Sequence, residues 1–286
     1  MRALEVLEAG PLSTVQDLGR PGQAALGVGD SGAMDRGALL LGNRLLGNPP
    51  GAAAVEATFG GLAVRAAAPL VVVLTGAPCP ATVAGTPVGA NAPVTLPAGA
   101  ELRLGTPAAG VRTYLCVRGG VEVEPVLGSR STDLLSGLGP EVLRPGTTLP
   151  VGVPTDPQPG LDQAPVPAPE SGEVTLRIIP GPRQDWFVPD ALATLTGAPY
   201  AATSDSNRVG MRLDGPELKR CRGEELPSEG MVRGAIQVPP SGQPTVFLAD
   251  HPVTGGYPVI AVVAATDLDR AAQVRPGQTV HFREAR

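Results

Sequence analysis

The stretch Ser228–Pro258 reads SEGMVRGAIQVPPSGQPTVFLADHPVTGGYP and contains two strand signals joined by a turn signal. Ile236 and Val238 give an alternating apolar pattern, which is typical of a half-buried strand. The Pro-Pro-Ser-Gly sequence that follows is typical of a turn. The apolar run Val246–Ala249 then predicts a buried strand. This stretch therefore predicts β-structure.

Short β-rich runs separated by glycine- and proline-containing turns continue along the rest of the chain. There are 38 glycines and 33 prolines among 286 residues, and helical periodicity is scarce. This pattern predicts a mainly β fold, built from barrels or sandwiches with few helices. Strands are expected at Leu70–Leu74, Val94–Leu96, Tyr114–Val117, Val174–Ile179, Val246–Leu248 and Val259–Val263.

Two helices are expected. The clearer one covers Asp35–Leu46, where Asp35 can cap the first turn and Gly47 with Asn48 ends the helix. A second, short helix is expected to begin at Thr266. The apolar face of the first helix is expected to consist of Leu39, Leu40, Leu45 and Leu46.

A proline-rich segment divides the chain. Pro150–Ser171 contains seven prolines with polar residues between them, which predicts an extended linker or a surface strap. Three short motifs recur in the same order on its two sides, which suggests duplication of one structural unit. The motifs are Leu-Thr-Gly-Ala-Pro at 74–78 and 195–199, Thr-Asp-Leu at 132–134 and 266–268, and Arg-Pro-Gly at 144–146 and 275–277.

The composition excludes several classes of protein. With 42% hydrophobic and 17% charged residues, the chain can build a sizeable core. The net charge of −5 and the pI of about 5.2 argue against a nucleic-acid-binding surface. The longest apolar runs, Leu70–Leu74 and Val259–Ala265, are too short to span a membrane. The N-terminal sequence MRALEVLEAG lacks a signal-peptide pattern.

The cysteines and histidines are too few and too scattered for a metal site. Cys79, Cys116 and Cys221 form no Cys-x-x-Cys pair, and their odd number favours reduced thiols in a cytoplasmic protein. His251 and His281 lie far apart in the sequence without paired cysteines, which makes a structural zinc site improbable.

Asp250 and His251 are the best candidates for acid–base chemistry. They end an apolar strand and precede the glycine-containing loop Thr254–Tyr257, a setting that suits a ligand site. Histidine ordinarily titrates near neutral pH, so it suits proton transfer. The alternative is a polar loop that caps a barrel, with the histidine donating to a backbone carbonyl.

Two arginines are candidates for binding a carboxylate or a phosphoryl group. Arg130 is flanked by hydroxyl residues, and Arg208 follows Asn207 in a similar polar setting. A guanidinium binds such anions through two parallel hydrogen bonds. The alternative is a structural ion pair with Asp205, Asp133 or Glu56.

Polar residues near the N-terminus form a further candidate group. Gln16, Asp17 and Arg20 lie in one turn-rich stretch, whose alternative interpretation is a loop in which Asp17 accepts from backbone N–H groups. Ser31 and Asp35 precede the first expected helix, where backbone N–H groups can receive an anion. The alternative there is simple N-capping.

The residues that carry a family resemblance run through nearly the whole chain. These segments are Thr14–Gly22, Ser31–Asp35, Asn43–Asn48, Glu56, Leu74–Pro78, Tyr114–Gly120, Leu127–Thr132, Ser206–Leu213 and Ser228–Pro258. Together they resemble the KipA-like biotin-dependent carboxyltransferase family, whose members act in 5-oxoprolinase and urea carboxylase.

The resemblance implies paired cyclophilin-like β-barrels, expected at 1–155 and 172–286. The ligand site is then expected in a cleft between the barrels, lined by Asp250, His251, Arg208, Asn207 and Gln237 together with the N-terminal candidates.

The resemblance also implies a role as one subunit of an ATP-dependent 5-oxoprolinase complex. Such a complex opens the lactam 5-oxoproline to L-glutamate, together with a subunit-B-like and a subunit-A-like chain. The alternatives are the carboxyltransferase component of a urea carboxylase-type system and a regulator that antagonises a kinase-inhibiting partner.

Lys219 is the one lysine of the chain, and no Walker motif precedes it. ATP is therefore expected at the level of the complex, and biotin is not expected to be attached to this chain.

Overall fold

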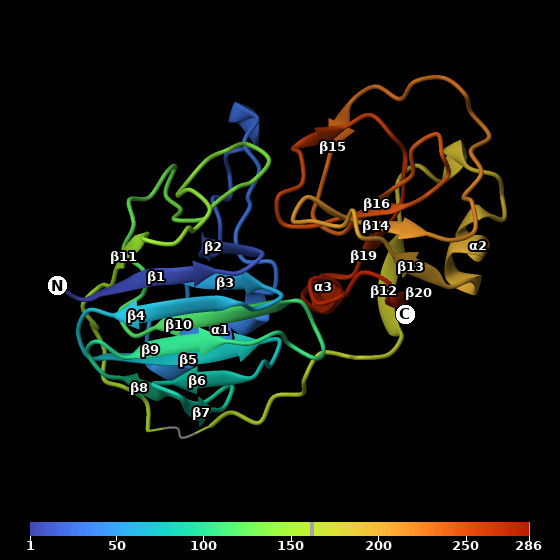
Figure 1. The fold of residues 1–286 in the computed structure, drawn as a ribbon. Coiled ribbons are helices and arrows are strands. Elements are labelled where there is room, and N and C mark those ends of the chain that lie inside the picture. The colour runs from blue at the N-terminus through green and yellow to red at the C-terminus, as the bar shows by residue number, and fades with distance from the viewer. Residues whose placement is uncertain (161–162, 286) are drawn as a thin grey trace. The chain divides into compact units, whose positions relative to one another are not determined.

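The computed structural model describes residues 1–160 and 163–285, and the chain divides into two compact units (Figure 1). Unit 1 comprises Met1–Arg20, Ser31–Asp133 and Gly137–Pro169. Unit 2 comprises Pro21–Asp30, Leu134–Ser136 and Glu170–Arg286. The short segments 21–30 and 134–136 thus belong to unit 2, although the expected bounds place them in the first half.

Unit 1 arranges its strands in two antiparallel sheets. One sheet has the order β11-β1-β4-β9-β6-β7, and the other has the order β2-β3-β10-β5-β8. The elements are β1 (Ala3–Ala9), β2 (Leu12–Gln16), α1 (Arg36–Leu46), β3 (Ala54–Thr58), β4 (Leu62–Ala66), β5 (Leu70–Gly76), β6 (Ala81–Val83), β7 (Thr86–Val88), β8 (Val94–Leu96), β9 (Glu101–Leu104), β10 (Arg112–Val117) and β11 (Thr148–Pro150).

The two sheets pack face to face, and α1 covers the outer face of the second sheet. On β5 and β10, Val72 and Leu115 belong to the cluster shared with the first sheet. Val73 and Cys116 alternate with them and pack against α1 instead. Successive strand side chains point to opposite faces. Both strands are therefore buried on both faces, which is why they read as continuous apolar runs.

Helix α1 confirms the first helix prediction. The Asp35 side chain accepts from the Ala38 N–H at 2.8 Å, and the helix ends at Gly47, whose φ is 66°. Leu39, Leu45 and Leu46 are buried as expected. The prediction for Leu40 was wrong, because this side chain points away from the sheet and is 38% exposed.

Gly42 lies where α1 packs tightly against the sheet, and it carries a stability prediction. An alanine Cβ at this position would lie 2.4 Å from Cys116 Sγ. Gly42→Ala should therefore lower the free energy of unfolding by about 1–3 kcal/mol, the usual cost of overpacking a core. Chemical denaturation measures the loss. Gly197→Ala is the control, because nothing lies within 4 Å of its added Cβ. Equal stability of both variants would contradict the prediction.

Unit 2 is built on a closed seven-stranded barrel with the order β12-β19-β16-β17-β14-β13-β20. Strands β12 and β20 close it in parallel, with Val174 opposite Val280. The elements are η1 (Ala24–Leu26), β12 (Val174–Pro180), η2 (Gln184–Trp186), α2 (Ala191–Gly197), β13 (Tyr200–Ala202), β14 (Gly210–Asp214), β15 (Glu229–Gly230), β16 (Ala235–Gln237), β17 (Thr245–Phe247), β18 (Thr254–Gly255), β19 (Val259–Val263), η3 (Ala265–Asp267), α3 (Leu268–Ala271) and β20 (Thr279–Glu284).

The mainly β prediction is confirmed, and all six predicted strands occur. The short helix expected at Thr266 also occurs, as η3 followed by α3. Helix α2 was not predicted. It shows that the Leu-Thr-Gly-Ala-Pro repeat does not mark equivalent elements, because the first copy begins in β5 and the second begins in α2.

The Arg-Pro-Gly repeat does mark two similar turns. In unit 1 the Thr147 N–H donates to the Arg144 carbonyl at 3.0 Å, just before β11. In unit 2 the Gln278 N–H donates to the Arg275 carbonyl at 3.0 Å, just before β20. Both strands then pair with the first strand of their unit, β11 with β1 and β20 with β12.

The proline-rich segment is a surface strap along unit 1. Arg118 donates through Nη2 to the Asp156 carbonyl, and the Ala164 N–H donates to the Asn91 carbonyl at 2.9 Å. Pro157 lies against the end of α1, where its carbonyl would be 2.6 Å from a Cβ added at Gly47. Residues 161 and 162 of the predicted strap fall outside the described residues.

Across the described part of the chain, every helix falls short of the combined length and apolar character that crossing a lipid bilayer requires.

Candidate functional site

Arg208 and Asp250 form a buried ion pair in unit 2. They lie beside the paired strands β14 and β17, which bring their side chains together. Arg208 Nε lies 2.8 Å from Asp250 Oδ2, and Nη2 lies 2.9 Å from Oδ1. The two side chains are 1% and 0% exposed. The Leu134 N–H also donates to Oδ2 at 3.1 Å. Both carboxylate oxygens therefore accept from fixed donors.

Asp250 is thus a structural partner of Arg208, a residue that the sequence analysis did not name for this role. Arginine can bind a carboxylate ligand through two parallel hydrogen bonds. Here the carboxylate that accepts both bonds is the side chain of Asp250. This contact favours a supporting role for the pair. A direct role of Asp250 in proton transfer stays a prediction.

His251 follows this pair and is half-buried. Its Nδ1 lies 2.8 Å from the Pro252 carbonyl oxygen. A carbonyl can only accept, so Nδ1 holds the proton of the neutral ring and Nε2 keeps the lone pair. This contact is the hydrogen bond to a backbone carbonyl that the alternative interpretation of His251 expected. The same hydrogen bond also orients Nε2, which can act as a base.

The side chains of Asn207 and Gln237 both form hydrogen bonds with backbone groups of this chain. Asn207 Oδ1 accepts from the N–H groups of Val209, at 2.8 Å, and Gly210, at 3.3 Å. Gln237 Nε2 donates to the Tyr257 carbonyl at 3.0 Å. Gln237 thereby holds the loop that follows His251. Their roles in substrate binding stay predictions.

Asp17 organises the polar loops of unit 1. It follows β2, and its Oδ1 accepts from the Gly19 N–H at 2.7 Å and from the hydroxyls of Ser129 and Ser131, each at 2.6 Å. Its Oδ2 accepts from the Arg130 N–H at 2.6 Å. The carboxylate thus has four donors in a buried site. The alternative interpretation of Asp17 expected such a loop, in which the carboxylate accepts from nearby groups of the chain. These hydrogen bonds fix the conformation of residues 129–131.

Arg130 and Arg20 differ in what surrounds their guanidinium groups. Arg130 Nη2 lies 2.7 Å from Glu122 Oε1, and its Nε donates to the Val123 carbonyl at 2.8 Å, so this arginine has a structural partner. Arg20 is buried. Its Nη2 donates to the Ser131 carbonyl, while its Nη1 lies 3.8 Å from Asp133 Oδ2.

Gln16 completes this group of unit 1. Its Nε2 donates to Thr14 Oγ1 at 3.0 Å and to the Thr132 carbonyl at 2.9 Å. Among the described residues, Gln16 Oε1, Arg20 Nη1 and Thr132 Oγ1 are buried without a hydrogen-bond partner. A buried polar atom in this state has capacity to bind water or a polar ligand.

Ser31 and Asp35 lie at the start of α1. Ser31 Oγ donates to the Thr132 carbonyl at 3.3 Å, and Ser31 adopts the left-handed region with φ of 54°. Asp35 caps the helix through Ala38, which is the simpler interpretation. Anion binding by this loop stays a prediction.

Glu56 and Tyr114 hold the same loop and were missed as site residues. Tyr114 donates through Oη to Glu56 Oε2 at 2.5 Å, and the Met34 N–H donates to the same oxygen at 3.0 Å. The available signal was the single carboxylate of the apolar stretch 52–57, because a buried carboxylate needs partners.

The predicted residues therefore form two groups. In unit 1, residues 129–133 are contacted by Gln16, Asp17, Arg20 and Ser31. In unit 2, Arg208 pairs with Asp250, and Asn207 and His251 are their neighbours in the sequence. The prediction that both groups line one cleft stays a prediction. Across the described ranges, no three His, Cys, Asp or Glu side chains are grouped to hold a metal ion.

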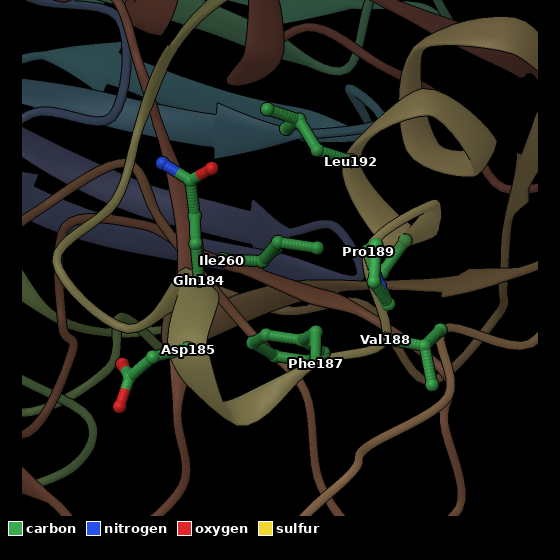
Figure 2. Close-up of a pocket in the computed structure, with 8 residues that line it drawn as sticks. Gln184, Asp185, Phe187, Val188, Pro189, Leu192 and Ile260 are labelled. Carbon is green, nitrogen blue, oxygen red and sulfur yellow. The ribbon is translucent and has the colours of Figure 1, made fainter.

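A separate hollow of about 340 Å³ opens on unit 2 beside η2 and α2 (Figure 2). Phe187, Pro189, Leu192 and Ile260 line it together with the polar Gln184 and Asp185, so its lining is mixed. None of the predicted site residues lines it.

With this geometry in place, the comparison with known proteins identifies the family. The family described as "carboxyltransferase domain, subdomain A and B" matches residues 26–284. The chain belongs to the carboxyltransferase domain family. The match includes Ser31, Arg130, Arg208 and His251, while Gln16, Asp17 and Arg20 precede it.

Among its relatives, this carboxyltransferase domain chain is similar to the C subunits of two bacterial 5-oxoprolinases. It is 38% identical to the one from Escherichia coli and 33% identical to the one from Haemophilus influenzae. Each match covers 98% of this chain and 90% of the relative.

The carboxyltransferase domain is also similar to part of a solved urea amidolyase. The crystal structure of the K. lactis enzyme matches with a TM-score of 0.93 and 29% identity. The match covers 99% of this chain but 19% of that enzyme chain. The chain thus corresponds to one part of a longer protein there, and to nearly the whole length of the two bacterial relatives.

Proposed function

We propose that the chain is a subunit of an ATP-dependent 5-oxoprolinase complex, which opens 5-oxoproline to L-glutamate. The observation that carries this proposal is the 38% identity to the C subunit of a 5-oxoprolinase along 98% of the chain. Since that relative is named as a subunit, the activity is expected to require partner chains.

The chemistry explains why ATP is needed. A lactam carbonyl is a poor electrophile, because the ring nitrogen donates electron density into it. Phosphorylation of the carbonyl oxygen makes the carbon electrophilic. One water adds to that carbon, the C–N bond breaks, and a second water releases the phosphate. The products are glutamate, ADP and inorganic phosphate. Such a site needs fixed hydrogen-bond donors for the developing negative charge.

The residues of this chain can meet parts of that requirement. His251 is the candidate base, because its Nδ1 contact with Pro252 leaves the Nε2 lone pair to take a proton from water. Gln16 Oε1 is an acceptor for the lactam N–H, and Arg20 Nη1 is a donor for a carbonyl or carboxylate oxygen. Arg208 and Asp250 support the strand end that carries His251.

The proposal also names partners. A subunit-B-like chain and a subunit-A-like chain are expected to complete the complex, and ATP is expected to bind without a Walker motif from this chain. The sequence contains one lysine, Lys219, outside any biotin-carrier motif, so no biotin attachment is proposed. The free thiols of Cys79, Cys116 and Cys221 agree with a cytoplasmic location.

A second candidate function is carboxyl transfer from carboxybiotin to urea. The observation that favours it is the TM-score of 0.93 with a urea amidolyase. In that case the biotin would be supplied by another chain.

An oxoproline-dependent ATPase assay tests the proposal. We expect glutamate and ADP only when this chain is combined with both partner chains, and no turnover by the chain alone. Urea with a carboxybiotin carrier serves as the competing substrate. Full oxoproline turnover by the isolated chain would contradict the need for partners. Carboxyl transfer to urea without oxoproline turnover would contradict the proposed activity.

A further inference from the structure

Glu56 and Tyr114 form a buried cross-strand pair in unit 1. Glu56 lies on β3 and Tyr114 on β10, directly opposite each other in the antiparallel register. The side chains are 1% and 0% exposed, and the Tyr114 hydroxyl donates to Glu56 Oε2 at 2.5 Å. Arg112 Nε lies 3.7 Å from Glu56 Oε1 and balances its charge. The pair therefore offers two buried oxygen atoms, Glu56 Oε2 and Tyr114 Oη, that accept hydrogen bonds.

The pair holds the loop that precedes α1. The Met34 N–H donates to Glu56 Oε2 at 3.0 Å, and the Asp35 N–H donates to Tyr114 Oη at 2.8 Å. The preceding Ala33 N–H donates to the Asp17 carbonyl at 2.9 Å. Three consecutive backbone N–H groups are therefore tied to three separate acceptors. Such a set of contacts determines the conformation of the loop.

The loop needs this support because its backbone is strained. Ser31, which is not a glycine, has φ of 54°. Residues in the left-handed region persist where surrounding contacts over-determine them, and they cluster at functional sites. The strain therefore has a local compensation in the bonds to Asp17, Glu56 and Tyr114.

The direction of the hydrogen bonds is also fixed. A backbone N–H can only donate, so Tyr114 Oη accepts a hydrogen bond from Asp35 and donates its own O–H in a hydrogen bond to Glu56. Burial, followed by the nearby Glu56 and Asp35 carboxylates, raises the pKa of Tyr114 well above its usual value. The phenol thus keeps its proton and does not act as an acid. Its hydroxyl links the Asp35 N–H to the Glu56 carboxylate through two hydrogen bonds.

We propose that Glu56 and Tyr114 are positioning residues, which hold Ser31 and Asp35 in the geometry required for substrate binding. The proposal rests on the 5-oxoprolinase function proposed above and on the predicted role of Ser31 and Asp35 in substrate binding. Neither residue contacts the reacting atoms. Both act through the backbone of the loop, so loss of the phenol oxygen should displace the loop without emptying the core.

Tyr114→Phe tests this in the full complex with both partner chains, and Tyr200→Phe is the matched control. Tyr200 is also buried, and its hydroxyl donates to the Pro216 carbonyl at 3.0 Å in unit 2, whereas the Tyr114 hydroxyl both donates to Glu56 and accepts from Asp35. We expect Tyr114→Phe to lower kcat/KM for oxoproline at least tenfold, mainly through KM. Amide hydrogen exchange of peptides covering 31–36 should become at least tenfold faster. Tyr200→Phe should change neither, although it also removes the hydroxyl of a buried tyrosine.

Two substitutions of Glu56 provide a second test, one that keeps an accepting oxygen and one that removes it. Glu56→Gln keeps an oxygen that can accept from Met34 and Tyr114, so it should retain most of the turnover and the slow exchange. Glu56→Leu should behave like Tyr114→Phe. Unchanged exchange and unchanged kcat/KM in Tyr114→Phe would overturn the proposal, as would an equal loss of turnover in both tyrosine variants. If the wild-type complex turns over no oxoproline, the proposed function fails separately, and the exchange measurement still decides whether this pair fixes the loop.

Discussion

Replacement of Arg208 by alanine should lower the free energy of unfolding by about 3–5 kcal/mol, because it leaves the Asp250 carboxylate buried without its main partner. The two side chains are 1% and 0% exposed, and two hydrogen bonds join them. Chemical denaturation of the isolated chain measures the change, and the loss should appear in the transition of unit 2.

Two further variants make this result specific. Arg103→Ala removes exposed ion pairs with Glu8 and Glu101, and should change stability little, because water screens such pairs. The double variant Arg208→Met with Asp250→Leu removes both charges and should recover much of the loss, since no charge is left buried. A single variant as stable as the wild type would show that the pair does not support the fold.

His251→Ala should reduce oxoproline turnover by the complex by about 10²–10⁴-fold, the usual contribution of a general acid or base. The half-buried ring donates through Nδ1 to the Pro252 carbonyl, which orients Nε2 for proton transfer. His251 is not among the buried core residues of the described part of the chain, so the melting temperature should stay near that of the wild type. Steady-state kinetics and thermal denaturation of the same preparations measure both quantities.

His281→Ala is the matched control. This histidine lies on β20 and contacts Glu173 at 3.1 Å, so its loss should leave turnover unchanged. Asp250→Asn should also reduce turnover if the carboxylate takes part in the chemistry. Normal turnover in His251→Ala would remove this ring from the mechanism. A fall in turnover matched by a fall in melting temperature would indicate a structural role instead.

Strands were predictable from the sequence because a strand that is buried on both faces consists of a continuous run of apolar residues. β5 and β10 are the clearest cases, since one face of each packs in the sandwich and the other under α1. Helix α2 was not predictable from its residues. The same five residues begin within a strand at 74–78 and within a helix at 195–199, so tertiary packing decides between the two conformations.

The candidate residues were predictable by type, but their partners were not. Asp250 pairs with Arg208 across two strands, and Asp17 binds residues more than 100 positions away in the sequence. Such contacts depend on strand register and loop path, which periodicity does not specify. The N-cap at Asp35 was predictable, because capping is local. The support of that same loop by Glu56 and Tyr114 depends on the pairing of β3 with β10, and only the fold reveals it.

The parallel pairing of β12 with β20 has a consequence for biosynthesis. Val174 must meet Val280, and residues 181–278 are synthesised between these two strands. At roughly 5–20 residues per second, the ribosome needs on the order of 5–20 s for that interval. During this time β12 and β13 each lack the neighbour that β20 later provides. Open strand edges pair readily with other chains. The nascent barrel therefore passes through an aggregation-prone period, in which chaperones that shield strand edges have time to act.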